Sequence, residues 1–521
     1  MSAETPKPPV IAKKPRAVTA PHGAVRNDDY YWLRDDSRTD PEMLAVLNAE
    51  NTYADAILAS SKPVADTLYR EITGRIKQDD ASVPYFKHGY WYYSRFETGK
   101  DYAIIARRKA SMDAPEEILF EQNLMAAGKG YFNIGDWEIS PDNQLVAWAE
   151  DSVGRRQYRL LVKNLLTGEV YADAVDNIEA NIVWADDNRT LFYIDKDPLT
   201  LLSKRVKTHV LGNDAALDAT VYEETDDSFY LGISRTRSER FICIQAQSTV
   251  SAEQRCTSAA VPGAFTVIAP RQRDFEYQAE HLNGRWVIRT NWDAPNFRLM
   301  VLADDRPFGD RSAWQELVPH KDDVFIESYE LFDGFMAIEE RSNALLRLRT
   351  LANDGKSEFV ASDEPAYSMG LNVNASPDTP WLRYAYTSLT TPNTVYEVNV
   401  ATSERRLLKR DPVLGGYDPD DYVTERQWAP ARDGTKIPVS LVFKKGFRKD
   451  GKAALLQYSY GSYGLSTDPR FLIINVSLLE RGMVYAIAHI RGGQEMGRAW
   501  YDSGKLLNKI NTFTDFIDVT R

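Results

Sequence analysis

The stretch AALLQYSYGSYGLSTDPRFLIINVSLLERGMVYAIAHIRGGQEMG, residues 453–497, decides the fold. Two short apolar runs, 453–456 and 483–490, each end in a cluster that contains glycine, which is typical of buried strands running into loops. Between them, residues 471–480 have the length of a helix, and the following Arg481-Gly482 supplies a cationic last turn and a glycine stop. The order strand, helix, strand predicts a βαβ unit.

Ligands of such sheets bind outside the carboxyl ends of the strands. Tyr460 and Tyr463 lie on the loop after the first predicted strand, and Arg491 lies on the loop after the second. The sequence therefore places the candidate functional site on these two loops.

Length and composition exclude several classes of protein. A chain of 521 residues exceeds what one hydrophobic core usually supports, so we expect at least two domains. The net charge of −12 argues against a nucleic-acid binder. No apolar run approaches the length of a membrane span, and no signal-peptide core follows the N-terminus. No metal or cofactor motif occurs, so neither is expected.

Cys243 and Cys256 are the two cysteines of the chain. Two cysteines cannot build a disulfide framework or a metal cluster, so we expect buried free thiols. Free thiols predict a reducing compartment, most simply the cytoplasm.

The N-terminal part is predicted to be helical after a loosely held arm at residues 1–25, which is rich in proline, alanine and lysine. Asp40-Pro41 forms a good start signal for a first helix that continues to Leu58. A second helix is expected over residues 64–76.

From about residue 84 to residue 408 the sequence consists of short aromatic and β-branched runs between turn residues. The groups of predicted strands start roughly 45 residues apart, a spacing typical of four-stranded propeller blades. We mark seven groups: 84–110, 131–171, 180–212, 226–259, 273–305, 327–355 and 371–410. This count predicts a seven-bladed β-propeller, and a pair of β-sandwiches is the alternative.

Eight segments of the chain resemble oligopeptidase B, the basic-residue-specific branch of the prolyl oligopeptidase family of serine peptidases. The segments are DDYYWLRDDSR (28–38), ISPDNQLVAWAED (139–151), RRQY (155–158), SLTTPNTVYE (388–397), ARDGTKIPVSLVF (431–443), YGSYG (460–464), HIRGG (489–493) and WYDSGKLLNKINTF (500–513). The resemblance implies a seven-bladed β-propeller inserted into an α/β-hydrolase domain, with the propeller acting as a size filter. The implied domains are 1–78 and 411–521 for the hydrolase part, and 79–410 for the propeller.

The catalytic triad of such an enzyme is not found in the sequence. A nucleophile elbow has the pattern G-x-S-x-G. Ser462 fails this pattern because position 460 is tyrosine, and His489 precedes the place where a serine is expected. His489 is interpreted as a structural histidine at a strand end, and the other histidines, which lack a supporting motif, are expected at the surface. By resemblance the hydrolase domain is incomplete, and the nucleophile, acid and base follow residue 521.

The resemblance assigns accessory roles to three residues. Tyr460 matches the tyrosine that donates into the oxyanion hole, although a loop tyrosine could simply pack over the strand ends. Tyr463 matches the aromatic residue that lines the pocket for the residue before the scissile bond. Asp468 matches a carboxylate of the neighbouring pocket for basic residues. Arg470 stands where a second acid is often found, which puts a strong dibasic preference in doubt.

Three functions remain open. The first is a serine oligopeptidase that cleaves short peptides after Lys or Arg, and the second is a related enzyme that cleaves after proline. The third is a propeller that serves as a non-catalytic binding module. The chain alone is expected to be inactive because nucleophile and base act as a unit. Expected partners are short basic peptides and a missing C-terminal catalytic segment, with no nucleic acid and no membrane.

Overall fold

The computed structural model describes residues 6–362 and 364–521. The predicted arm includes residues 1–5, which lie outside the described residues. The chain forms two compact units, residues 1–76 and residues 77–521. Within the described part, no helix is both long enough and apolar enough to cross a membrane.

The first unit contains the two predicted helices. The helix α1 (Pro41–Leu58) begins where the sequence indicates, because the Asp40 side chain accepts a hydrogen bond of 2.8 Å from the Met43 amide. The helix α2 (Lys62–Gly74) starts slightly earlier than expected. The predicted loose arm is partly wrong, since β1 (Arg16–Thr19) and β2 (Val25–Asp28) pair as an antiparallel hairpin. Two 3-10 turns complete the unit: η1 (Tyr31–Leu33) and η2 (Ala59–Ser61).

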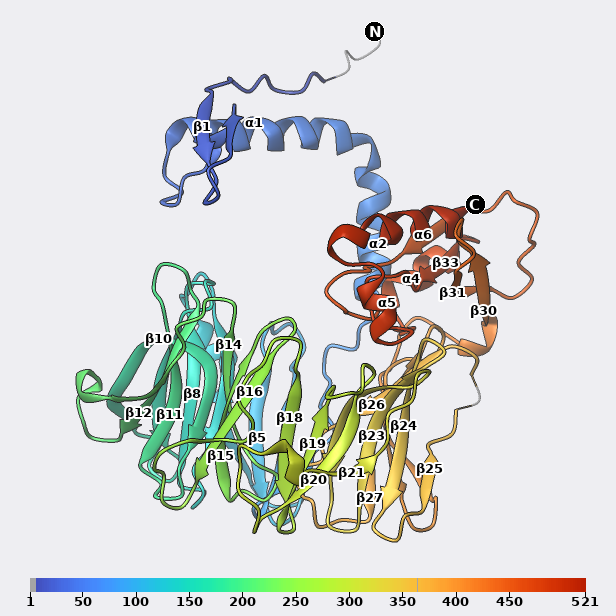
Figure 1. The fold of residues 1–521 in the computed structure, drawn as a ribbon. Coiled ribbons are helices and arrows are strands. Elements are labelled where there is room, and N and C mark those ends of the chain that lie inside the picture. Colours follow the sequence, from blue (N-terminus) through green and yellow to red (C-terminus); the bar gives the residue numbers. More distant parts are fainter. Residues whose placement is uncertain (1–5, 363) are drawn as a thin grey trace. The chain divides into compact units, whose positions relative to one another are not determined.

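The second unit begins with seven successive groups of four strands, which we call blades 1 to 7 (Figure 1). Blade 1 consists of β3 (Tyr85–Lys87), β4 (Tyr90–Arg95), β5 (Ile104–Lys109) and β6 (Glu116–Glu121). Blade 2 consists of β7 (Asn133–Ile139), β8 (Leu145–Asp151), β9 (Tyr158–Asn164) and the start of β10 (Val170–Trp184). Blade 3 consists of the end of β10, β11 (Thr190–Lys196), β12 (Ser203–Val210) and β13 (Ala219–Glu223). Blades 4 and 5 are β14 (Tyr230–Arg235), β15 (Phe241–Gln247), β16 (Ala252–Ser258) and β17 (Thr266–Val267); then β18 (Tyr277–Leu282), β19 (Arg285–Thr290), β20 (Arg298–Ala303) and β21 (Gln315–Val318). Blades 6 and 7 are β22 (Phe325–Leu331), β23 (Phe335–Ser342), β24 (Leu345–Ala352) and β25 (Ser357–Phe359); then β26 (Tyr367–Leu371), β27 (Trp381–Ser388), β28 (Thr394–Asn399) and β29 (Arg405–Arg410).

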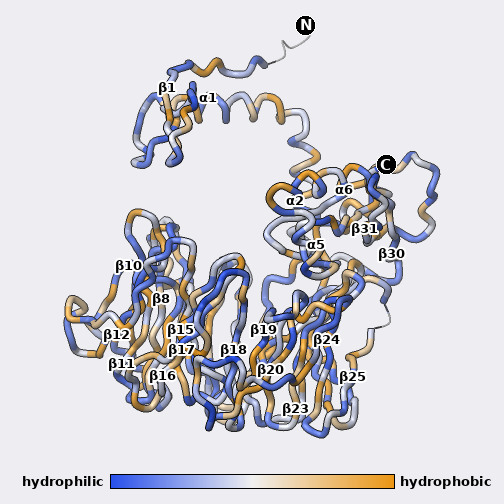
Figure 2. Tube along the Cα trace, viewed as in Figure 1, coloured by the Kyte–Doolittle hydropathy of each residue, from blue (hydrophilic) through white to orange (hydrophobic). Residues whose placement is uncertain are grey.

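The hydrophobic cores lie between neighbouring blades. One cluster joins Trp148 of blade 2 to Phe120 of blade 1, and another joins Trp286 of blade 5 to the cysteines of blade 4. Hydrophobic residues recur along the blade strands (Figure 2), as expected for sheets that pack face to face. The predicted seven-bladed propeller is therefore confirmed, and the β-sandwich alternative is excluded.

Side chains of blade 7 bind the segment that leads into blade 1. Arg383 of blade 7 donates to the Pro84 carbonyl at 2.9 Å, and Lys409 pairs with Asp80 at 2.5 Å. No described strand of blade 7 pairs with a strand of blade 1.

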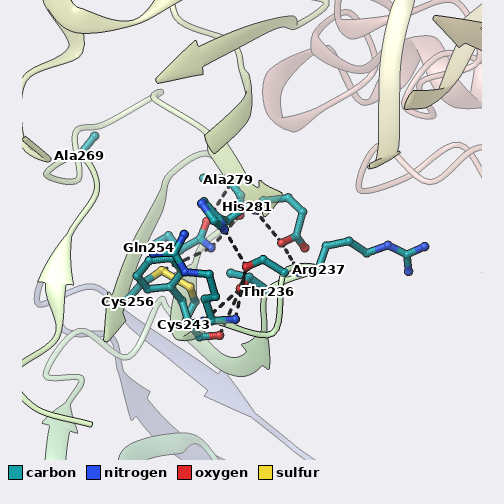
Figure 3. The surroundings of a disulfide bond; sticks show 12 residues. Thr236, Arg237, Cys243, Gln254, Cys256, Ala269, Ala279 and His281 are labelled. Carbon is teal, nitrogen blue, oxygen red and sulfur yellow. Dashed lines mark hydrogen bonds between the residues drawn. A yellow bond between two sulfur atoms is a disulfide. The ribbon is translucent and has the colours of Figure 1, made fainter. Parts of the chain in front are cut away.

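The prediction of free thiols is wrong. Cys243 on β15 and Cys256 on β16 are directly opposed in the register of the hairpin and form a disulfide (Figure 3). Both are buried between blades 4 and 5, with 1% and 3% of their surface exposed. A disulfide across a hairpin needs only two cysteines in register, so two cysteines suffice without a wider disulfide framework.

The prediction that the other histidines lie at the surface is wrong for two of them. His281, on β18, is completely buried and hydrogen-bonds Ser238 at 2.7 Å and Asp304 at 2.9 Å. His209, on β12, is buried against Asp218 at 2.9 Å. Both are structural links of the propeller, since each sits in a polar cluster of the blades.

Replacing both cysteines, Cys243→Ala together with Cys256→Ala, is expected to lower the free energy of unfolding by about 3 kcal/mol, because the bond closes a loop of roughly 14 residues. Urea denaturation without reductant measures the change. As a control, wild-type protein reduced in urea and refolded with reductant should lose a similar amount. Equal stability of the oxidised wild type and the double variant would contradict a stabilising bond.

After blade 7 the chain forms a small mixed sheet of order β30-β31-β33-β32. The strands β30 (Tyr422–Pro430) and β31 (Lys436–Lys444) form a hairpin around Asp433-Gly434, while β32 (Leu455–Tyr458) pairs parallel with β33 (Val484–Ala488). The helices are α4 (Ile473–Leu479), α5 (Arg498–Asp502) and α6 (Ile510–Thr520). The short elements are α3 (Gln122–Ala126), η3 (Ala215–Leu217), η4 (Arg311–Ala313), η5 (Pro419–Asp421) and η6 (Leu506–Asn508).

The predicted βαβ unit is confirmed as β32, α4 and β33. One detail of the prediction is wrong, because β32 is an edge strand and not a buried one. Leu455 and Leu456 are 48% and 42% exposed.

Candidate active site

The loops that follow β32 and β33 are joined backbone to backbone. The Gly464 amide donates to the Gly492 carbonyl at 3.0 Å. Gly492 has φ +105°, and a Cβ there would lie 2.1 Å from the Gly461 carbonyl oxygen. Glycine is therefore required for this close approach. The structure thus brings Tyr460 and Tyr463 to the same edge of the sheet as Arg491, as the sequence predicts.

The N-terminal turn of α6 holds the same two loops. Thr512 donates to the Arg491 carbonyl at 2.7 Å, and Lys509 donates to the Gly461 carbonyl at 2.5 Å. Burial lowers the pKa of the Lys509 ammonium group. These contacts fix the backbone of one loop at Gly461 and of the other loop at Arg491.

Tyr460 and Tyr463 both present their rings to solvent. Tyr460 is 46% exposed and Tyr463 is 76% exposed. Tyr463 lies at a cavity of about 400 Å³. The cavity is lined by Tyr463, Gln494, Arg498 and Tyr501, and by propeller residues Tyr230, Gln247, Ser248, Thr249 and Glu276. An exposed ring beside a cavity can pack along the aliphatic stem of a long side chain.

Asp468 has a strong partner in the propeller. Both of its carboxylate oxygens accept from the guanidinium group of Arg341, at 2.6 and 3.0 Å. Arg341, from β23, is buried and also donates to Glu327 at 2.7 Å. Burial disfavours its charge, but the hydrogen bonds and charge of Asp468 outweigh this effect and raise the pKa of Arg341. A substrate cation at Asp468 would have to share the carboxylate with Arg341.

Arg470, which departs from the family pattern, and Gln494 lie on the same loops. Arg470 is exposed. The Gln494 side chain lies over Gly464, where a Cβ would come within 3.0 Å of the Gln494 amide carbon. Gln494 therefore packs the two loops against one another.

His489 is a structural residue, as its sequence context indicates. It is 1% exposed, and its Nε2 atom lies 2.8 Å from the Ser440 hydroxyl on β31. Burial lowers its pKa to about 4, so the imidazole is neutral at pH 7.

Arg491 and Asp515 form a buried ion pair that sequence reasoning missed. The guanidinium group donates to both carboxylate oxygens of Asp515, at 2.8 and 2.6 Å, and to Asp433 at 2.7 Å. Asp515 on α6 is completely buried. The sequence contains a weak indication of this pair, because an arginine at the end of an apolar strand requires a buried acidic partner.

Comparison with known proteins agrees with this architecture. Residues 9–411 match the prolyl oligopeptidase N-terminal β-propeller domain, and residues 469–521 match the prolyl oligopeptidase family domain. The chain is 61% identical to "Dipeptidyl aminopeptidase BI" of Pseudoxanthomonas mexicana, over 99% of this chain and 74% of that one. It is 34% identical to "Protease 2" of Moraxella lacunata, over 95% and 72% of the two chains.

Solved structures show the same likeness. Oligopeptidase B from Leishmania major superposes with a TM-score of 0.93 at 33% identity, covering 99% of this chain and 76% of that one. The resemblance inferred from the sequence is thereby confirmed. The chain belongs to the prolyl oligopeptidase family of serine peptidases and comprises the N-terminal propeller and part of the peptidase domain.

Proposed function

We propose that this protein takes part in the hydrolysis of short peptides on the carboxyl side of Lys or Arg, with the propeller restricting substrate size. One observation carries the proposal: two loops joined backbone to backbone present two exposed tyrosines, Tyr460 and Tyr463, at the carboxyl ends of parallel strands. Likeness to oligopeptidase B structures supports the basic specificity.

Each site residue has a proposed role. The Tyr460 hydroxyl donates to the oxyanion that develops on the scissile carbonyl, a contribution of about 3 kcal/mol in comparable sites. Tyr463 packs along the substrate Lys or Arg, and Asp468 contributes negative charge to the neighbouring pocket.

The domain division proposed here is 1–78 and 411–521 for the hydrolase part, with 79–410 as the propeller. The blade strands, which run from Tyr85 to Arg410, support the inner boundaries.

The chain is proposed to work with a further polypeptide segment that carries the nucleophile, acid and base. The edge strand β32 offers a place for it, because Leu455, Leu456 and Tyr458 are 48%, 42% and 50% exposed. An unpaired parallel edge with apolar side chains is a template for another strand.

A second candidate function is the removal of dipeptides from peptide N-termini. The observation that favours it is the 61% identity to a relative named dipeptidyl aminopeptidase BI. Acetylated and free-amine versions of one arginyl peptide substrate distinguish the two functions, since only an aminopeptidase requires the free amine.

Residues 1–521 alone are expected to hydrolyse no arginyl amide substrate and to take no fluorophosphonate label, because no G-x-S-x-G pattern occurs among them. Intact-mass measurement of material purified from its native source, run with the label, checks this. A copurifying, labelled second polypeptide would support the proposal. Substrate hydrolysis by the pure 521-residue chain, or its reaction with the label, would contradict the proposal. A chain that takes no label and copurifies with no second polypeptide would indicate a binding module.

The cytoplasmic location stays a prediction, and one of its two grounds no longer holds. It rested partly on free thiols, whereas Cys243 and Cys256 form a disulfide, and disulfides persist mainly in oxidising compartments. Acid quenching of cells, followed by thiol alkylation in denaturant and mass measurement, decides between the two, because both cysteines are buried in the folded protein. Unmodified Cys243 and Cys256 would place the protein in an oxidising compartment.

A further inference from the structure

A buried carboxyl group lies beneath the two loops of the candidate site. Glu495 follows Gln494 on the loop after β33 and is 1% exposed. Its Oε1 atom accepts a hydrogen bond of 2.8 Å from the Thr467 amide, on the other loop. Its Oε2 atom is buried and has no hydrogen-bond partner among the described residues. Thr467 immediately precedes Asp468, so Glu495 fixes the backbone next to a proposed substrate-binding residue.

The loop is shaped around this side chain. A Cβ at Gly493 would lie 2.1 Å from Glu495 Oε2, so glycine leaves the room that the carboxyl group occupies. The Gly464–Gly492 hydrogen bond joins the same loops a few residues away. Glu495 therefore adds a second direct link between them, and this link can ionise whereas the backbone link cannot.

We propose that Glu495 is the positioning residue of the loop that carries Tyr463 and Asp468, and that its buried carboxyl group holds this loop closed in the protonated form. The identification of the loop as a substrate loop rests on the proposed function. The closure itself does not.

Burial is the main reason why the carboxyl group of Glu495 retains its proton, and the charges around it modify the effect. Burial is the largest influence and raises the pKa of Glu495 to about 7, whereas the Thr467 hydrogen bond and the charge of Arg341 lower it. Asp468 raises it in turn by like-charge repulsion. His489, the buried histidine at the end of β33, is neutral at pH 7 and adds no charge.

The direction of the pH effect follows from proton linkage. In an open loop the carboxyl group meets water and returns to its ordinary pKa of 4.5, so the open state binds fewer protons than the closed state between pH 4.5 and 7. Raising the pH through this range therefore favours opening. These two pKa values predict that the equilibrium constant for loop opening increases about tenfold between pH 6 and pH 8.

Hydrogen exchange of the full 521-residue chain tests this inference. After correction for the intrinsic exchange rate, the protection of amides in residues 461–470 is expected to fall about tenfold between pH 6 and pH 8. Glu495→Gln keeps an oxygen acceptor for the Thr467 amide and removes the group that titrates. In this variant the protection of the amides in residues 461–470 should be independent of pH. Glu425→Gln, at a surface acid paired with Lys449, is the matched control and should retain the wild-type profile.

Two results would overturn the inference: a flat profile in the wild type, or an unchanged slope in Glu495→Gln. Binding of an arginine-containing peptide, measured at the same pH values, tests the proposed function separately. Exchange that follows the expected profile without peptide binding leaves the positioning role intact and contradicts the substrate role. Peptide binding with a flat exchange profile supports the substrate role and contradicts the positioning role.

Discussion

Replacing Arg491 with methionine is expected to lower the free energy of unfolding by about 3–5 kcal/mol, the usual effect of removing one partner of a buried ion pair. Asp515 is completely buried and receives two hydrogen bonds from this guanidinium group. Without Arg491 its carboxylate must either stay charged without a cation or take up a proton. Urea denaturation followed by circular dichroism measures the loss.

Arg432→Met is the matched control because Arg432 pairs with Asp518 on the same helix, α6, yet its side chain is 52% exposed. This variant should lose about 1 kcal/mol, less than Arg491→Met, since Arg432 is exposed and water can replace it beside Asp518, which is 10% exposed. Equal losses in the two variants would contradict a special role for burial. The double variant Arg491→Met with Asp515→Leu should recover part of the loss, since it leaves no buried charge unpaired, and the other partner of Arg491, Asp433, is 43% exposed.

Gly492→Ala is expected to have a comparable effect, about 2–6 kcal/mol, from backbone strain together with overpacking. The φ of +105° is unfavourable for alanine, and the new Cβ would lie 2.1 Å from the Gly461 carbonyl oxygen. Separation of the two loops should follow. Thermal unfolding measures the loss of stability, and hydrogen exchange of residues 461–470 reports the separation.

Gly446→Ala separates the two causes. Gly446 has φ +82°, but a Cβ added there would meet no atom within 4 Å, so only backbone strain operates at this position. This variant should lose about 1 kcal/mol. If Gly492→Ala lost no more than Gly446→Ala, the close approach of the loops would not require glycine.

The parts of the fold that were predictable carry a local signal. Asp40-Pro41 starts α1 because a capping carboxylate and a proline act within one turn. The inner blade strands were predictable because their hydrophobic residues either alternate with polar ones or form a continuous run. The outer strands β13 and β17 were missed because they are short and partly exposed, and they form only by pairing with a neighbour that is already in place.

The candidate site was predictable in its place but not in its contacts. Glycines after two apolar runs located the loops. The partner of Asp468 is Arg341, which lies on a propeller blade 127 residues away, far beyond the reach of any local sequence pattern. The Cys243–Cys256 bond was missed for a related reason, since register between two strands decides which side chains face each other.

The long strand β10 has a consequence for how the propeller assembles. It pairs with β9 at its start and with β11 at its end, so blades 2 and 3 share one uninterrupted strand. Once blade 2 has formed, the position of β10 is already fixed. The first strand of blade 3 therefore needs no separate step to find its register. These two blades should therefore fold and unfold as one cooperative unit.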